Sequence, residues 1–152
     1  MKHYHFPIVH AAVVQAAPVL FDCEATLAKT QRLIAEASAQ GANLILFPEA
    51  FIPAYPRGLT FGTVVGYRNP IGRKTWQVYL ANAIDVPGPV TEVLGTAARQ
   101  ARAYVIVGVI ERDQNSRGTL YCSLLYFAPD GRLLGKHRKL KPTGSERLIW
   151  GE

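Results

Sequence analysis

The sequence contains few cysteines and lacks long apolar runs. Cys23 and Cys122 are its only cysteines, too few for a disulfide framework and not spaced as metal ligands. Polar residues or prolines interrupt each apolar stretch before it reaches the roughly 20 residues that a membrane-spanning helix needs. This composition argues against a disulfide-rich secreted scaffold and against a membrane protein. We therefore expect a cytoplasmic protein with no membrane partner.

Nothing in the sequence indicates a cofactor. His3 and His5 could bind a metal ion opportunistically, but two histidines close to an N-terminus are more often ordinary polar residues. The chain has no Cys and His cluster with the spacing of a zinc site. We therefore expect neither a metal nor an organic cofactor.

The charge pattern gives little sign of a polyanionic partner. Hydrophobic residues make up 49% of the 152 residues and charged residues 18%, a balance typical of one ordinary globular domain. The formal net charge is +6, yet the basic residues gather only in "KHRKLK", residues 136–141. A nucleic-acid binder would use such a run to neutralise phosphates. Because a strand-like apolar pattern interrupts the run and no nucleic-acid motif accompanies it, we expect no nucleic-acid partner.

Hydrophobic patterning predicts an α/β fold with a mixed sheet covered by helices on at least one face. A strand is predicted at 9–16, a helix at 24–40 that Asp22 caps, and a buried strand at 43–47. After a long loop at 48–70 with room for one short helix, helices are predicted at 75–83 and 89–102. "YVIVGVIER" and "TLYCSLLYFAP" predict a hairpin, which a shorter strand at 133–137 follows.

Glu49 and Lys139 are the strongest candidates for chemistry. Glu49 directly follows a predicted buried strand, the position where α/β sheets commonly build their sites, although an exposed loop glutamate would give the same pattern. Lys139 follows the last predicted strand. If that strand neighbours 43–47, the Lys139 ammonium could reach Glu49 and stabilise a developing anion. Spacing does not distinguish Lys139 from Lys136 or Lys141.

The sequence resembles the nitrilases of the carbon-nitrogen hydrolase superfamily. The matching stretches include "LILFPEAFIPAYPRGLTFG", "VPGPVTEVLGTAAR", "VGVIERD", "TLYCSLLYFAPDGRLLGKHRKLKPT" and "ERLIWGE", and they occur in family order along the chain. The resemblance implies the N-terminal half of an αββα sandwich, so that residues 1–152 form an incomplete nitrilase domain. It also implies a Glu-Lys-Cys triad, an organic nitrile as substrate, a carboxylic acid and ammonia as products, and assembly into a homo-oligomer.

The family motifs suggest roles for individual residues. Glu49 matches the general base and acid, and Lys139 matches the lysine that stabilises the tetrahedral intermediate. Glu146 lies where related enzymes have a second, supporting glutamate, but it could instead form an ion pair with Arg147 or another neighbour. Three loop residues either wall the substrate pocket or pack under the loop: Phe51, Tyr55 and Pro56.

The nucleophilic cysteine of the family lies beyond the "WGxGDG" segment, inside which this sequence ends. Cys122 matches a family cysteine that is not the nucleophile, and we expect it to be buried. We therefore expect residues 1–152 to be inactive by themselves. Two alternatives stay open. One is an amidase or another carbon-nitrogen hydrolase with the same triad, and the other is a short interaction protein that binds a partner with its uncovered sheet face.

Overall fold

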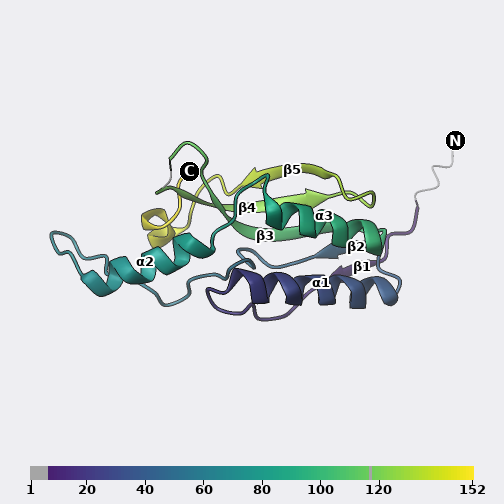
Figure 1. Ribbon diagram of the computed structural model, residues 1–152, viewed down its shortest axis with the longest axis horizontal. Coiled ribbons are helices and arrows are strands. Elements are labelled where there is room, and N and C mark those ends of the chain that lie inside the picture. Colours follow the sequence, from purple (N-terminus) through teal and green to yellow (C-terminus); the bar gives the residue numbers. More distant parts are fainter. Residues whose placement is uncertain (1–6, 117) are drawn as a thin grey trace, which may run out of the picture.

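The computed structural model describes residues 7–116 and 118–152, and these residues contain a five-stranded mixed sheet (Figure 1). Its strands lie in chain order: β1 (Ala11–Val13), β2 (Leu44–Leu46), β3 (Tyr104–Arg112), β4 (Leu120–Phe127) and β5 (Leu133–Arg138). β1, β2 and β3 are parallel, whereas β4 and β5 are each antiparallel to the preceding strand. The predicted α/β fold with a mixed sheet and a β3–β4 hairpin is confirmed.

The helices are α1 (Cys23–Ala39), α2 (Pro70–Asn82), α3 (Pro89–Ala101) and the 3₁₀ helix η1 (Gly144–Leu148). Asp22 caps α1 as predicted, since its side chain accepts a hydrogen bond from the Ala25 N–H at 2.8 Å. α2 begins before the predicted start at residue 75. Its first turn depends on an Asn69 cap and on Pro70 at the first helical position, signals that apolar periodicity does not contain. Residues 47–69 form turns and bridges without the short helix that we allowed for.

The main core lies between the sheet and two helices. Ile34 of α1 and Leu94 of α3 pack against Val105 and Val107 of β3 and Leu125 of β4. Figure 1 shows α3 beside β3 and β4, whereas α2 extends away from the sheet. Strand alternation directs these odd-numbered residues of β3 and β4 toward the helices. One face of the sheet is therefore covered by α1 and α3.

The opposite face of the sheet is partly covered. A second apolar cluster there joins Ile110 of β3 and Cys122 of β4 to Tyr79 of α2 and to Trp150 near the end of the chain. Farther along this face the side chains are open to solvent, as Val13 of β1 is 75% exposed. The open area is apolar, as in a sheet that another layer covers.

Gly108 lets the chain that follows β2 bulge over one face of β3. A Cβ atom on Gly108 would lie 2.2 Å from the carbonyl oxygen of Pro48 and 2.7 Å from the Cα of Glu49. Beyond this bulge, Ile52 pairs with β3 again and exchanges backbone hydrogen bonds with Gly108 and Ile110. A glycine inside a strand commonly marks such a close backbone approach. The bulge places Glu49 over β3, on the face opposite α1 and α3.

We expect Gly108→Ala to destabilise the protein by about 1–3 kcal/mol, the usual cost of forcing extra carbon into a packed site. The neighbouring atoms belong to the backbone and cannot rotate away. Urea unfolding of this variant and of Gly135→Ala provides the measurement, because a Cβ on Gly135 would meet no atom within 4 Å. Equal stabilities of the two variants would contradict the close approach at Gly108.

Candidate functional site

Three charged side chains from distant parts of the chain converge on one point. The Lys139 ammonium donates hydrogen bonds to Glu49 Oε1 and to Glu146 Oε2, both at 2.8 Å. Glu49 belongs to the loop after β2, Lys139 directly follows β5, and Glu146 lies in η1. The structure therefore brings together the acid and the amine that the sequence singled out, 90 positions apart.

Lys139 reaches Glu49 by a route other than the one considered from the sequence. β5 pairs with β4, not with β2, so β3 and β4 lie between the two strands. Glu49 covers part of this distance because its loop bulges over β3 at Gly108. Lys139 extends the ladder of β5, and its backbone N–H donates to the carbonyl oxygen of Cys122 at 2.8 Å. Adjacent strands are thus not required for the contact.

The structure also separates the three lysines of the basic run. Lys136 pairs with Glu111, and Lys141 pairs with Glu152 at the surface. Lys139 is the member of the run that bonds to Glu49. Lys136 and Lys139 lie on opposite faces, since successive residues of a strand alternate. Each lysine has its own acidic partner.

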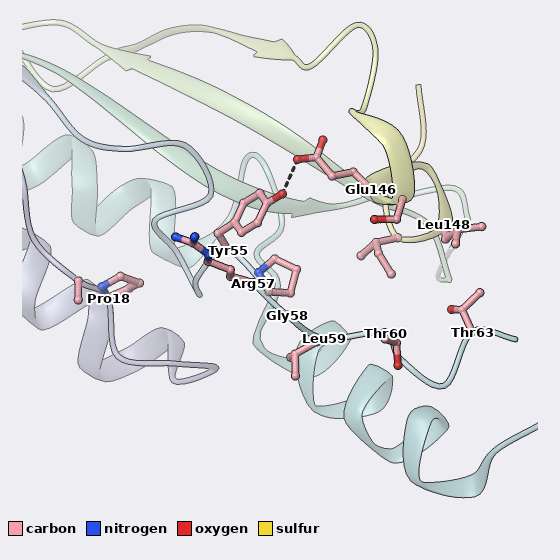
Figure 2. A pocket seen from close by; sticks show the side chains of 13 residues that line it. Pro18, Tyr55, Arg57, Gly58, Leu59, Thr60, Thr63, Glu146 and Leu148 are labelled. Carbon is pink, nitrogen blue, oxygen red and sulfur yellow. Dashed lines mark hydrogen bonds between the residues drawn. The ribbon is translucent and has the colours of Figure 1, made fainter.

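Glu146 is held by several donors. Besides Lys139, the Tyr55 hydroxyl donates to Oε1 at 2.6 Å, as Figure 2 shows, and the Thr143 N–H donates to Oε2 at 2.6 Å. Burial by itself would raise the pKa of Glu146, but these hydrogen bonds outweigh burial and lower the pKa. Of the partners that the sequence left open, Glu146 bonds to Lys139, whereas the Arg147 guanidinium makes its contacts elsewhere.

Lys139 is a permanent cation in this site. Burial by itself would lower the pKa of Lys139, but the hydrogen bonds to Glu146 and Glu49 outweigh it and raise the pKa. Its ammonium lies 5.8 Å from the centre of the Trp150 ring, which forms a T-shaped pair with the Tyr55 ring. A cation fixed in this way can stabilise negative charge on a reacting atom but is a poor proton donor.

The three loop residues considered for the substrate pocket separate into two groups. Tyr55 and Pro56 line a cleft of about 920 Å³ between their loop, η1 and the segment at Pro18 (Figure 2). Phe51 is 1% exposed and packs against Phe47 in the main core, at 5.2 Å between ring centres. Phe51 therefore packs under the loop, which is the second of the two roles considered for these three residues.

A second cavity, of about 560 Å³, opens beside the Glu49–Lys139 pair. Its lining includes these two residues, Cys122 and His137. The sequence analysis missed His137 at this position. Alternation on β5 would have found it, because residues 137 and 139 point to the same face. Glu146 borders the larger cleft and Glu49 the smaller one, so the charged cluster lies between the two spaces.

Neither cysteine of the chain offers a thiolate to this cluster. Cys122 is buried, as predicted, and its thiol donates a long hydrogen bond to Glu49 Oε1 at 3.5 Å. Burial and the neighbouring Glu49 carboxylate raise the pKa of Cys122 to about 12. Cys23 begins α1, and burial and Asp22 raise its pKa as well. Both side chains are therefore thiols at neutral pH.

Residues 7–116 and 118–152 show neither a cluster of metal ligands nor a helix that could span a membrane. His3 and His5 lie outside residues 7–116 and 118–152. Within those ranges, no three His, Cys, Asp or Glu side chains gather as ligands for a metal ion. No helix in the described part of the chain has both the length and the apolar character to cross a bilayer.

We expect Cys122 to resist alkylation by iodoacetamide at pH 8 in the folded protein, because burial and Glu49 keep its thiol protonated. Peptide mass spectrometry after timed labelling gives the rate. In guanidinium the same residue should react at the rate of an ordinary cysteine. Rapid labelling of the native protein would contradict the assignment of Cys122 as a buried thiol.

We expect Glu146→Gln to destabilise the protein by about 1.5–3 kcal/mol at pH 7, the usual range for hydrogen bonds to a charged group. Because the folded-state pKa of Glu146 lies below the unfolded value, this contribution is present above the unfolded pKa and lost as pH falls through the folded pKa. Urea unfolding should therefore show the difference from wild type shrinking from pH 7 toward about pH 3.

Glu36→Gln is the matched control for this titration, since Glu36 forms an exposed pair with Arg32 on α1. Its effect should be small at both pH values, as is usual for surface pairs. A difference between Glu146→Gln and wild type that stays constant with pH would show that the charge of Glu146 is not the cause.

Comparison with known proteins identifies relatives along nearly the whole chain. Residues 10–152 match the profile of the carbon-nitrogen hydrolase family. The chain is 60% identical over 141 residues to an aliphatic nitrilase of Sinorhizobium fredii, covering 93% of this chain and 44% of that protein. It is 51% identical over 145 residues to a bifunctional nitrilase/nitrile hydratase of Nicotiana tabacum, covering 95% of this chain and 41% of that protein. The chain thus spans less than half the length of these two relatives.

Solved structures share the fold at lower identity. The amidase of Nesterenkonia sp. AN1, as a double mutant in complex with acrylamide, has a TM-score of 0.67 at 17% identity, with 93% of this chain and 47% of that chain covered. Nit3 of Saccharomyces cerevisiae has a TM-score of 0.65 at 21% identity, with 88% and 44% covered. The resemblance to nitrilases is confirmed, and the chain belongs to the carbon-nitrogen hydrolase family.

Proposed function

We propose that this protein hydrolyses organic nitriles to carboxylic acids and ammonia, using Glu49, Lys139 and a cysteine thiolate from outside these 152 residues. The contact of the Lys139 ammonium with the two carboxylates, beside an open cavity, is the observation that carries this proposal. Two relatives at 51% and 60% identity are named nitrilases, which favours nitriles over other carbon–nitrogen substrates.

Glu49 is the proton carrier in this proposal. Its side chain is 48% exposed, so a substrate or water molecule can reach it. One oxygen, Oε1, contacts both the Lys139 ammonium and the Cys122 thiol. A carboxylate with this access can take a proton from an attacking thiol or water and return it to the departing nitrogen.

Lys139 and Glu146 act as a pair. Lys139 offsets the negative charge of the tetrahedral intermediate, a role that needs a cation at a fixed place. Glu146 fixes it, since Glu146 is itself held by Tyr55 and Thr143. In this view Glu146 positions the ammonium, whereas Glu49 exchanges protons.

The reaction uses two water molecules. Glu49 takes the proton of the thiol, the resulting thiolate attacks the nitrile carbon, the nitrogen takes this proton from Glu49, and a thioimidate forms. The first water adds to the thioimidate carbon, Glu49 passes both protons of this water in turn to nitrogen, and ammonia leaves as the carbon–nitrogen bond breaks. The second water cleaves the resulting thioester, which releases the carboxylic acid and regenerates the thiol.

The state of the two cysteines present supports a nucleophile from another segment. Cys122 and Cys23 both have raised pKa values, and Cys122 is buried. The relatives extend well beyond the matched region, since the chain covers 44% and 41% of their lengths. We therefore propose that residues 1–152 contribute the acid and the amine, and that this segment by itself releases no ammonia from nitriles.

We expect Glu49→Gln and Lys139→Ala each to lower kcat for ammonia release by roughly 10²–10⁴-fold in the full-length protein, the usual contribution of a positioned proton carrier or charge. Ammonia is measured with aliphatic and aromatic nitriles and with the corresponding amides. Glu36→Gln, on the exposed side of α1, should keep the wild-type rate.

Three outcomes of this assay would change the proposal. Wild-type turnover in either site variant would remove the assigned role of that residue. Faster turnover of amides than of nitriles would make the protein an amidase. Ammonia release by residues 1–152 without further sequence would mean that one of the two cysteines present is the nucleophile.

A further inference from the structure

β5 lacks the apolar alternation that normally fixes the register of a strand. Most of its residues are exposed, including Leu134 at 53%, and its pairing with β4 shifts between Tyr126 and Phe127. Register is weakly specified where neither face of a strand is apolar and buried, and a slip by one residue exchanges the two faces. Such a slip would turn Lys139 away from Glu49.

A buried acid lies on the other face of β5, under the residues that precede Lys139. Glu111 of β3 is 1% exposed, and its carboxylate accepts hydrogen bonds from the Ser123 hydroxyl at 2.8 Å and from Lys136 and Arg138 at 2.5 Å each. Burial by itself would raise the pKa of Glu111, but the hydrogen bonds from Arg138, Lys136 and Ser123 outweigh it and lower the pKa. Glu111 is therefore a buried anion with two cationic partners.

Two further contacts fix the Arg138 side chain. Its guanidinium carbon lies 3.7 Å from the centre of the Tyr121 ring, a cation–π contact, and one of its nitrogens lies 3.5 Å from Asp113. Arg138 immediately precedes Lys139 in the chain. Because successive side chains alternate, holding Arg138 against Glu111 directs Lys139 to the opposite face.

We propose that Glu111 is a positioning residue: by binding Lys136 and Arg138 it selects the register of β5 in which Lys139 faces Glu49 and Glu146. In the native register two permanent cations meet the buried carboxylate. After a slip of one residue, His137 and Lys139 would take their places, leaving a histidine where one permanent cation had been. Removing a cationic partner from a buried anion strongly destabilises the folded state.

The catalytic consequence of this inference rests on the proposed function, but the register itself does not. We expect Glu111→Gln in the full-length protein to lower kcat by roughly 100-fold, the cost of misplacing a reacting group by about 1 Å, with a much smaller change in KM. Glu111→Asp keeps the charge, and the long side chains of Lys136 and Arg138 can follow it, so most of the rate should return.

Two measurements report the register directly. In hydrogen exchange, Glu111→Gln should lose the protection of backbone amides selectively in β5, including the Lys139 amide that donates to the Cys122 carbonyl oxygen. Amine labelling followed by peptide mass spectrometry should show faster modification of Lys139, whose ammonium in the native register is held between two carboxylates. If Glu111→Gln does not fold, Arg138→Gln removes one partner from the less buried side and should give smaller changes in the same direction.

Asp130→Asn is the matched control, because it breaks an exposed pair with Arg132 in the turn between β4 and β5. We expect this variant to keep the wild-type kcat, the wild-type hydrogen-exchange protection of β5 and the wild-type rate of Lys139 labelling. The inference is overturned if Glu111→Gln keeps wild-type kcat and β5 protection, or if protection falls equally in all strands with unchanged labelling of Lys139. If the wild-type protein does not hydrolyse nitriles, the proposed function fails, whereas exchange and labelling still decide the register.

Discussion

The hydrogen-bonded contact between the Lys139 ammonium and the carboxylates of Glu49 and Glu146 joins the three parts of this structure that sheet pairing alone leaves apart. It connects the loop after β2, the end of β5 and η1. The two anions around this cation differ in their surroundings. Glu146 is held by Tyr55 and Thr143, whereas Glu49 keeps a half-exposed side chain. Of the two carboxylates, Glu49 is therefore the more accessible to solvent.

The sheet distributes its charges between two faces. On the face toward α1 and α3, the buried Glu111 pairs with the partly exposed Lys136 and Arg138, and on the opposite face Lys139 pairs with Glu49. Strand alternation is sufficient to divide the basic run in this way. The basic run at 136–141 could suggest a polyanion-binding tail, but its lysines and its arginine pair with acidic side chains of the same chain. Glu111 and Glu49 thus lie on opposite faces of the sheet and pair with the consecutive residues Arg138 and Lys139.

The site also depends on backbone that has no charge. Glu49 can lie over β3 because Gly108 has no side chain, and this position brings it toward Lys139 although β2 and β5 are not neighbours in the sheet. The same face carries the Cys122 thiol, close to Glu49 but protonated. An acid and an amine thus lie beside a cavity together with a buried, protonated thiol.

The helices, the strands and the candidate site residues could largely be predicted from the amino-acid sequence. Patterning located the strands and most of the helices, because local periodicity reflects which face is buried, and the family motifs singled out Glu49, Lys139 and Glu146. Local signals could not decide the rest. The route over Gly108, the choice among the lysines, the place of Phe51 in the core and the protonated state of Cys122 depend on contacts between residues far apart in the chain. These features emerge in the folded molecule, because burial and charge pairing arise when such segments pack together.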